Sequence, residues 1–179
     1  MAIADQPAPA SGLEAAANMR DSYKHWMESQ GIPIHRGYFI DDVRTVEVAP
    51  WEERGCNACF LELAGQQGVS ETRITEIPPG ATTEPTRFNL DEMVYVADGR
   101  GLTTVWAGDR PKKTFELQKH SMFLLPRGYT YQLSNAQGNH PARLMHVNHL
   151  PMAMRIVPDP KLFFDTPYVV PDVLDGDGS

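Results

Sequence analysis

Two cysteines, Cys56 and Cys59, have the C-x-x-C spacing of a redox dithiol or of half a zinc site. A redox pair needs a helix N-terminus to lower a thiol pKa, and a zinc site needs two further ligands. The segment 60–63 (FLEL) instead alternates as a strand does, and no second C-x-x-C or H-x-x-x-H follows it. We therefore interpret both cysteines as half-buried residues entering a strand, in a protein of a reducing compartment.

Histidine is the side chain best suited to acid–base chemistry near neutral pH, and His146 and His149 lie in one predicted strand. Residues two apart share a face of a strand, so these two histidines face opposite sides unless a bulge intervenes. Either His146 with Asn148, or His149 with Val147, therefore points inward. The other histidines fall in a helix, loops or turns and are expected to face solvent: His25, His35, His120 and His140. The sequence has no phosphate-binding loop, G-x-S-x-G elbow or H-E-x-x-H motif.

The elements that must position these side chains are predicted to be short strands. The chain has 15 prolines and 14 glycines, and such frequent turn residues favour strands over long helices. Alternating segments predict strands at 57–64, 70–77, 83–89, 92–97, 102–107, 113–117, 121–125, 129–134 and 142–149. Even spacing of short strands is typical of a β-sandwich or barrel. Helical spacing of apolar residues predicts a helix over 13–29, before Gly31 and Pro33, and a short strand is expected at 43–48.

Length and composition indicate one globular domain with tails. The 179 residues are 41% hydrophobic and 22% charged. A net charge of −7 argues against nucleic acid or an anionic membrane as partner. Because no signal peptide and no long apolar span is recognised, we expect a cytoplasmic protein.

The chain is predicted to divide into four segments. These are a flexible N-terminal arm over 1–12, a helix and leading strand segment over 13–56, a barrel over 57–150, and an extended C-terminal arm with a disordered acidic tail over 151–179. Phe163, Phe164 and Tyr168 of that arm are expected to pack on the barrel exterior or on a neighbouring subunit.

Two stretches resemble the signature motifs of the cupin superfamily. The first motif places a glycine, two histidines, a glutamate and a glycine at the positions of Gly80, Thr86, Phe88, Glu92 and Gly99. The second corresponds to His120, Pro126, Gly128, Tyr131 and Asn135. Six of these positions keep the family residue: Gly80, Glu92, Gly99, Pro126, Gly128 and Asn135. The resemblance implies an all-β fold, the double-stranded β-helix or jelly-roll barrel, and the flanking segments look like small bacterial monocupins, gentisate-dioxygenase-like in outline.

The departures from the family fall on its metal ligands. In cupins three histidines and one glutamate from these motifs bind a divalent metal inside the barrel. Here Thr86, Phe88 and Tyr131 stand at the histidine positions, and Glu92 alone is kept. Because a transition metal needs imidazole, thiolate or several carboxylate ligands, we expect no metal at the family's site.

Strand parity indicates what lines the barrel if the family's histidine positions point inward. The inward residues are then Glu84, Thr86, Phe88, Glu92, Val94, Val96, Tyr129, Tyr131 and Leu133, so the cavity is predicted to be aromatic and aliphatic. Desolvation in such a cavity should raise the pKa of Glu92. Together with Tyr131, and with His146 and Asn148 if these point inward, Glu92 would form a metal-free acid–base cluster. Alternatively, Glu92 is only hydrogen-bonded to Tyr131 or Arg87, and His146 is an ordinary barrel residue. Arg73 is a further candidate for binding a substrate carboxylate.

Three functions remain open. The first is metal-independent lyase, isomerase or dehydratase chemistry at Glu92 on a small aromatic or unsaturated acid, without a cofactor, with Tyr131 stabilising an oxyanion. The second is non-catalytic binding of such a ligand. The third is a metal-dependent dioxygenase with ligands rebuilt from Glu84, Glu92, His146 or His149. The resemblance also implies a homodimer, and the apolar helix 13–29 and the arm 160–171 are the candidate interface elements.

Overall fold

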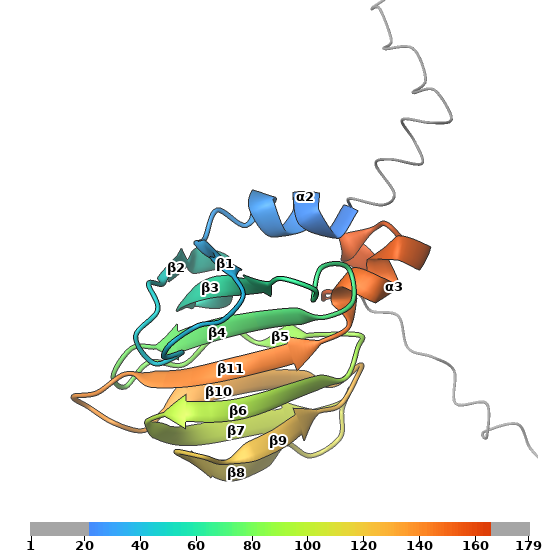
Figure 1. Cartoon of the computed structure of the whole chain (residues 1–179). Helices are drawn as coiled ribbons and strands as arrows, with labels where there is room; N and C mark the ends of the chain where they lie inside the picture. Colours follow the sequence, from blue (N-terminus) through green and yellow to red (C-terminus); the bar gives the residue numbers. More distant parts are fainter. Residues whose placement is uncertain (1–21, 166–179) are drawn as a thin grey trace, which may run out of the picture.

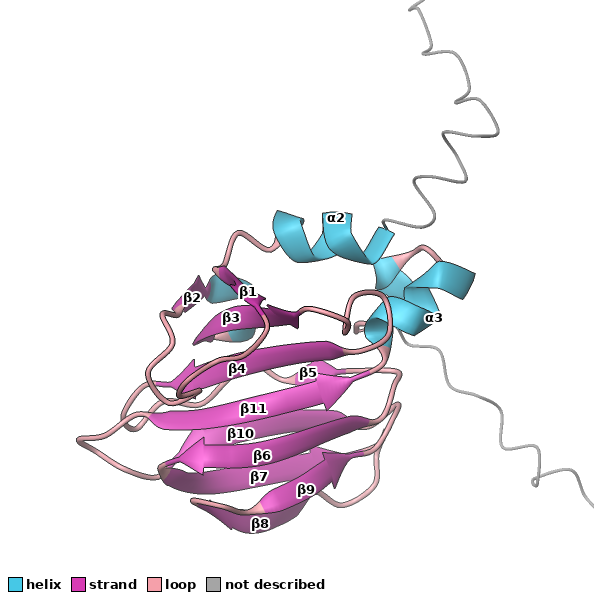
Figure 2. Cartoon of the chain, viewed as in Figure 1, coloured by secondary structure: helices cyan, strands magenta, loops and turns pink. Residues whose placement is uncertain are grey.

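The computed structural model describes residues 22–165 and consists of two facing β-sheets with two helices on one side (Figures 1 and 2). The larger sheet has the order β1-β3-β4-β11-β6-β9, with β2 beside β3, and the smaller has the order β5-β10-β7-β8. The strands are β1 (Ile34–Gly37), β2 (Ala49–Trp51), β3 (Cys56–Leu63), β4 (Glu71–Ile77), β5 (Thr86–Arg87), β6 (Glu92–Asp98), β7 (Arg100–Trp106), β8 (Lys113–Gln118), β9 (Met122–Leu125), β10 (Thr130–Asn135) and β11 (Ala142–Asn148). The helices are α2 (Ser22–Ser29) and α3 (Leu150–Ile156), with 3₁₀ turns η1 (Glu52–Arg54) and η2 (Pro160–Leu162).

Alternation of buried and less buried residues explains why the central strands form. Along β11 every second residue from Ala142 to Asn148 is buried, and along β10 the buried residues are Tyr131, Leu133 and Asn135. This period of two places one set of side chains between the sheets. Gly99 closes the turn from β6 to β7 with a φ of +85°, and a Cβ there would lie 2.8 Å from the Cα of Ala142. Only glycine accommodates that turn.

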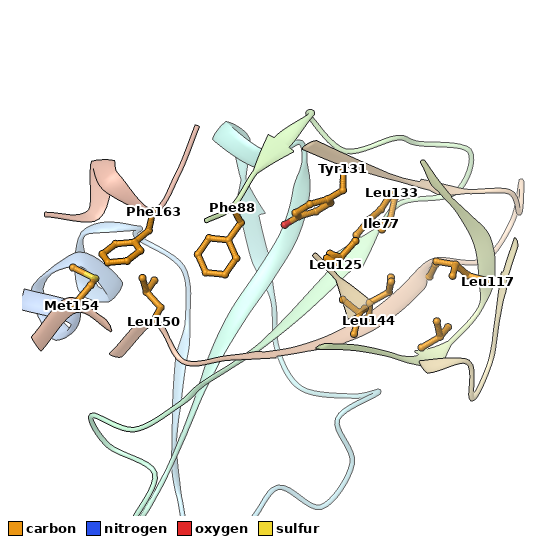
Figure 3. Packing of buried hydrophobic residues seen from close by; sticks show 13 residues of the cluster. Ile77, Phe88, Leu117, Leu125, Tyr131, Leu133, Leu144, Leu150, Met154 and Phe163 are labelled. Atoms are coloured by element: carbon orange, nitrogen blue, oxygen red, sulfur yellow. The ribbon is translucent and has the colours of Figure 1, made fainter. Parts of the chain in front are cut away.

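The apolar core lies between the two sheets and continues under the helices (Figure 3). At one end Ile77, Leu144 and Leu133 pack together, and at the other Phe88 and Leu150 lie near the helices. A second cluster places Met27 of α2 against Phe60 of β3. Packing of this second cluster fixes α2 against the larger sheet.

Three segments differ from the sequence-based expectation. Residues 43–48 form turns rather than a strand, because Asp42 accepts a hydrogen bond from the backbone N–H of Arg44, and the apolar side chains that follow cover the outer face of the larger sheet. The strand expected at 83–89 is reduced to Thr86–Arg87, since Pro85 has no N–H to donate.

The C-terminal segment is not wholly extended as expected, because residues 150–156 form α3. Pro151 lies in the first turn of α3, where proline is tolerated, and the backbone N–H of Leu150 donates to the Asn148 side chain at 2.9 Å. Leu150 and Met154 of this helix are buried in the core. Of the helix expected over 13–29, residues 22–29 are helical; residues 13–21 and Tyr168 lie outside the described residues.

Candidate functional site

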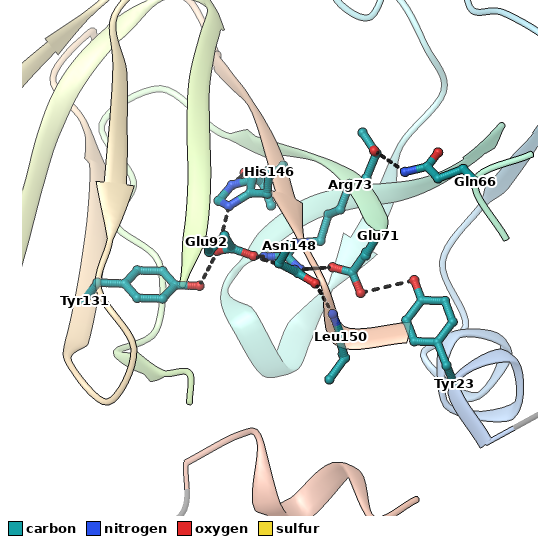
Figure 4. A network of polar contacts seen from close by, with 11 residues as sticks. Tyr23, Gln66, Glu71, Arg73, Glu92, Tyr131, His146, Asn148 and Leu150 are labelled. Atoms are coloured by element: carbon teal, nitrogen blue, oxygen red, sulfur yellow. Dashed lines mark hydrogen bonds and ion pairs between the residues drawn. The ribbon is translucent and has the colours of Figure 1, made fainter. Parts of the chain in front are cut away.

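A polar cluster occupies the inner face of three neighbouring strands of the larger sheet (Figure 4). Strand β4 contributes Glu71 and Arg73, β6 contributes Glu92, and β11 contributes His146 and Asn148. The pairing of β11 with β4 places Asn148 opposite Glu71, and His146 opposite Arg73. All five side chains are buried, with exposed fractions of 4% or less.

Arg73 holds two carboxylates at once. One terminal nitrogen donates to Glu92 Oε1 at 2.6 Å, and the other donates to Glu71 Oε1. The Asn148 side-chain nitrogen donates to the same two oxygens, at 3.0 Å for Glu92 and 3.1 Å for Glu71. Buried charges are tolerated only when they are paired and hydrogen-bonded, so Arg73 and Asn148 are what allow both glutamates inside the barrel.

Glu92 is ionised, which corrects the expectation of a raised pKa. Burial alone raises its pKa, but the positive charge of Arg73, the interaction with His146 and the hydrogen bond from Asn148 outweigh burial. The net pKa of Glu92 therefore lies well below its usual range. Because both of its oxygens accept hydrogen bonds, Glu92 is suited to orienting its neighbours rather than to donating a proton.

Glu71 differs from Glu92 although the two share Arg73. Its pKa is raised, first by burial and then by the negative charge of Glu92, against the opposing effect of Arg73. The Tyr23 hydroxyl of α2 donates to Glu71 Oε2 at 3.1 Å, which links this carboxylate to the helix. The cluster thus combines one strongly ionised carboxylate with one that is easier to protonate.

His146 is a neutral histidine with both ring nitrogens engaged. Burial lowers its pKa despite the opposing charge of Glu92. Since an ionised Glu92 can only accept, Nδ1–H donates to Glu92 Oε2 at 2.9 Å. The opposite ring nitrogen, Nε2, then accepts from the Thr75 hydroxyl at 2.8 Å. Of the two orientations left open by the sequence, the structure has His146 and Asn148 inward, and His149 is exposed.

Tyr131 completes the group of three predicted catalytic residues. Its hydroxyl donates to Glu92 Oε2 at 3.4 Å, a long contact (Figure 4). Burial and the nearby Glu92 charge raise the Tyr131 pKa far above its usual value, so the phenol stays protonated. The structure therefore brings Glu92, Tyr131 and His146 together, with Glu92 between the other two.

A small cavity of about 30 Å³ lies beside this cluster, which is enough space to hold ordered water. Its walls include aromatic rings, as expected, but they also carry two guanidinium groups. The lining residues are Trp51, Arg54, Cys56, Arg73, Thr75, Thr83, Thr86, Tyr131, Leu133, His146 and Phe164. The expectation of an aromatic and aliphatic cavity with one or two carboxylates is therefore met only in part, because the charged lining residues are arginines.

Of the remaining predicted binding residues, some line the cavity and others lie elsewhere in the structure. Thr86 and Leu133 line the cavity, whereas Asn148 and Glu92 lie behind its wall. Phe88 is buried in the core, where its ring stacks on Phe164 at 5.0 Å.

Two predicted positions fall outside the cavity. Glu84 is exposed and Tyr129 is half-buried away from the lining, which corrects their assignment as inward residues. The alternation of inward and outward residues does not continue before Thr86, because β5 is only two residues long. Thr83 therefore points inward instead of Glu84.

Arg54 and Arg73 both line the cavity, and both lie close to the indole ring of Trp51. The Cζ atom of each lies 5.7 Å from the centroid of Trp51. Arg54 donates to the Thr86 hydroxyl at 3.2 Å and to Asp165 Oδ2 at 3.0 Å. The Nε of Arg73, in contrast, is buried with no hydrogen-bond partner among the described residues. A buried donor without a partner lacks an acceptor, and Arg73 is also one of the residues that line the cavity.

The divalent metal implied by the family resemblance does not fit this donor set. Glu92 already accepts hydrogen bonds on both oxygens, and the guanidinium of Arg73 places a positive charge against one of them. Within residues 22–165, no group of three or more His, Cys, Asp or Glu side chains is arranged to hold a metal ion. The exposed side chains of Glu84 and His149 lie away from the cluster, so they cannot rebuild the ligand set.

The cysteines lie in β3 as expected, but they are fully buried rather than half-buried. Cys56 lines the cavity, whereas Cys59 packs under the loop that covers the outer face of the sheet. Burial raises the pKa of each thiol to about 11. Neither thiol is activated, and the two lie on opposite faces of the sheet, so they do not form a redox pair.

Sequence reasoning missed several residues of the site. Arg73 was named as a candidate, but Glu71 and Thr75 were missed, although polar residues recur on the buried face of β4 with a period of two. Arg54 and Phe164 had no such signal. They come from a 3₁₀ turn and from the C-terminal segment, whose arrival at the barrel opening depends on tertiary packing.

Comparisons with known proteins show the fold. The sequence matches no protein-family model and no curated protein. Among solved structures, an oxalate oxidase superposes with a TM-score of 0.53 at 16% identity, over 63% of this chain and 59% of that one. The oxalate decarboxylase of Lactobacillus farciminis, in a formate complex, gives 0.51 at 17% identity, over 63% and 35%. The Cnp3 cupin domain of Schizosaccharomyces pombe gives 0.47 at 20% identity, over 60% and 66%.

The chain therefore has the cupin-type jelly-roll fold predicted from its motifs. At these identities the likeness establishes the fold and leaves the activity open. Within residues 22–165, no helix is long and apolar enough to cross a membrane.

Proposed function

We propose that this cupin-fold protein binds a small carboxylate in the cavity between Arg54 and Arg73. The observation that carries the proposal is the buried Nε–H of Arg73, which has no partner although it belongs to a residue of the cavity wall. A carboxylate oxygen is the acceptor that a guanidinium binds best. The second guanidinium, of Arg54, belongs to the same lining and would add a further positive charge.

The wall of the cavity supports this ligand chemistry in two further ways. Thr86 and Tyr131 belong to the lining, and each hydroxyl would donate to a carboxylate oxygen by turning from its present acceptor, the Glu84 carbonyl for Thr86 and Glu92 for Tyr131. The small size of the cavity favours a small ligand, such as formate or acetate, over a larger acid while the walls keep their present positions. The replacement of the family's metal-ligating histidines fits a site in which guanidinium groups supply the positive charge.

The experiment is a thermal unfolding series with formate and acetate at constant ionic strength. A ligand at 100 times its Kd stabilises the native state by about 2.7 kcal/mol, which is a measurable rise in Tm. Formate or acetate should raise Tm, and sodium chloride at equal concentration should not. Arg54→Gln should abolish the rise. Arg44→Gln is the matched control, because Arg44 is an exposed arginine that pairs with Asp42.

Absence of any shift with the carboxylates in the unmodified protein would refute the proposal. An equal loss in Arg44→Gln would also refute it, since the effect would then come from net charge.

A second candidate function, metal-independent proton transfer, is favoured by the Glu92–His146 pair. His146 is neutral, lines the cavity, and has its Nδ1–H fixed by an ionised carboxylate. In that arrangement Nε2 would accept a proton from a bound acid once the Thr75 hydroxyl turns away from it, and Glu92 would stabilise the imidazolium that forms. Tyr131, protonated and in the same wall, would donate to developing negative charge.

The test of this candidate is solvent exchange of carbon-bound protons in small carboxylic acids, followed by NMR in D₂O. Catalysed exchange that is lost in His146→Gln and reduced in Glu92→Gln is expected. Exchange that survives unchanged in His146→Gln would assign the proton transfer to another group.

A further inference from the structure

The C-terminal strap, residues 159–165, closes the opening of the barrel beside β5. Its backbone is tied to the chain at a few points: Asn89 N–H donates to Phe163 O at 2.9 Å, and Asp165 N–H donates to Arg87 O at 2.8 Å. Phe164 forms an isolated bridge with Phe88. Because β5 is the edge of the smaller sheet, the strap can leave without breaking a ladder inside that sheet.

The side chain of Phe164 fills an aromatic slot at the cavity. Its ring stacks on Trp26 at 5.1 Å with an interplanar angle of 16°, and on Phe88 at 5.0 Å with an angle of 25°. The Cζ atom of Arg54 lies 5.0 Å from the same ring centroid. Phe164 is also part of the cavity wall, so its removal would join the cavity to the slot.

The next residue, Asp165, supplies a carboxylate to the same arginine. Its Oδ2 accepts from Arg54 at 3.0 Å, and its Oδ1 accepts from the backbone N–H of Arg87 at 2.9 Å. The Asp165 side chain is half-exposed, and its backbone has a φ of +53°, a left-handed conformation that aspartate and asparagine adopt more readily than most residues with a side chain. The strap thus places an aromatic ring and a carboxylate, one residue apart, on Arg54.

We propose that the strap is an internal occupant of a binding site for aromatic carboxylates. The carboxylate of the ligand takes the place of Asp165 on Arg54, and its ring takes the place of Phe164 between Trp26 and Phe88. This proposal rests on the proposed function, because it extends the same arginine-bearing site. An acid larger than acetate enters only when the strap opens. Because the strap is attached to the chain, it competes with the ligand at a high effective concentration, which weakens the measured affinity of the ligand.

Calorimetric titration with phenylacetate and with acetate tests the proposal on three forms of the protein. Asp165→Asn removes the competing charge and keeps an amide oxygen for Arg87 N–H, in a residue that tolerates the left-handed conformation. Phe164→Ala empties the slot and leaves the charges unchanged. Both variants should bind phenylacetate about tenfold more tightly than the unmodified protein, and the gain for acetate should be several-fold smaller. The ratio of the gain in phenylacetate affinity to the gain in acetate affinity cancels the effect that a change of net charge has on both acids.

Hydrogen exchange supplies the readout that separates opening from ordinary binding. Phenylacetate should speed exchange of the Asp165 and Asn89 amides, which are the donors that tie the strap down. Slower exchange of these amides, or phenylacetate affinity unchanged in both variants, would overturn the strap proposal while acetate binding left the proposed function standing. If neither acid binds any form, the proposed function itself fails.

Discussion

Inward-facing and outward-facing residues alternate along the whole length of strands β4, β6 and β11. The inward-facing residues differ in polarity between the two ends of these strands. At one end the inward residues are apolar, as with Ile77, Val96 and Leu144. At the other end they are charged or polar, as with Arg73, Glu92 and His146. The apolar end is sufficient to stabilise the fold, since burial of apolar surface is the main favourable contribution to the free energy of folding. Charged and polar side chains are costly to bury, and their concentration beside the cavity identifies the polar end as the place for function.

Arg73→Met tests the polar end most severely. It leaves two buried carboxylates without their shared cation, and removal of one partner from a buried pair costs about 3–5 kcal/mol. We expect a loss of that size in urea unfolding at pH 7. Arg143→Met is the matched control, because Arg143 lies on the same strand pair and binds Glu76 in a more exposed pair. An equal loss in both variants would show that the buried position has no special weight.

Leu144→Ala tests the apolar end. Leu144 is 1% exposed, and truncation of a buried leucine costs about 2–5 kcal/mol through lost burial and the cavity left behind. We expect a loss of about 3 kcal/mol in urea unfolding, with acetate affinity unchanged within the error of titration. A fall in affinity that parallels the fall in stability would mean that the two ends are one cooperative unit and that the comparison does not separate fold from site.

The same contrast explains what the sequence could predict. Most strands of the barrel were located correctly because alternation and turn glycines such as Gly99 are local signals. The inward placement of Glu92 and Tyr131 followed from motif positions and parity. The sign of the Glu92 pKa shift did not follow, because it depends on Arg73, a residue from a different strand. The pairing of Arg54 with Asp165 could not be predicted from the sequence, since the two residues lie 111 positions apart and come into contact only in the folded chain.

Glu92→Gln gives a smaller and pH-dependent effect. A carboxylate with a lowered folded pKa contributes stability above its unfolded pKa, near 4.3, and loses that contribution as pH falls toward the folded pKa. The variant should therefore be less stable than the unmodified protein by about 2 kcal/mol at pH 7. The difference should shrink below pH 4. Urea unfolding from pH 3 to pH 8 measures it, and a constant difference across that range would contradict an ionised Glu92.

Glu71→Gln should show the opposite sign with the smallest effect. A raised folded pKa means that the unfolded state releases its proton first, so the stability of the unmodified protein falls as pH rises from the unfolded pKa through the folded one. Glutamine has no proton to lose in that window. Measured by the same unfolding series, Glu71→Gln should therefore gain stability relative to the unmodified protein as pH rises above the unfolded pKa, by about 1 kcal/mol. If Glu71→Gln and Glu92→Gln instead follow the same pH trend, the two carboxylates titrate as equivalent groups, and Arg73 does not distinguish between them.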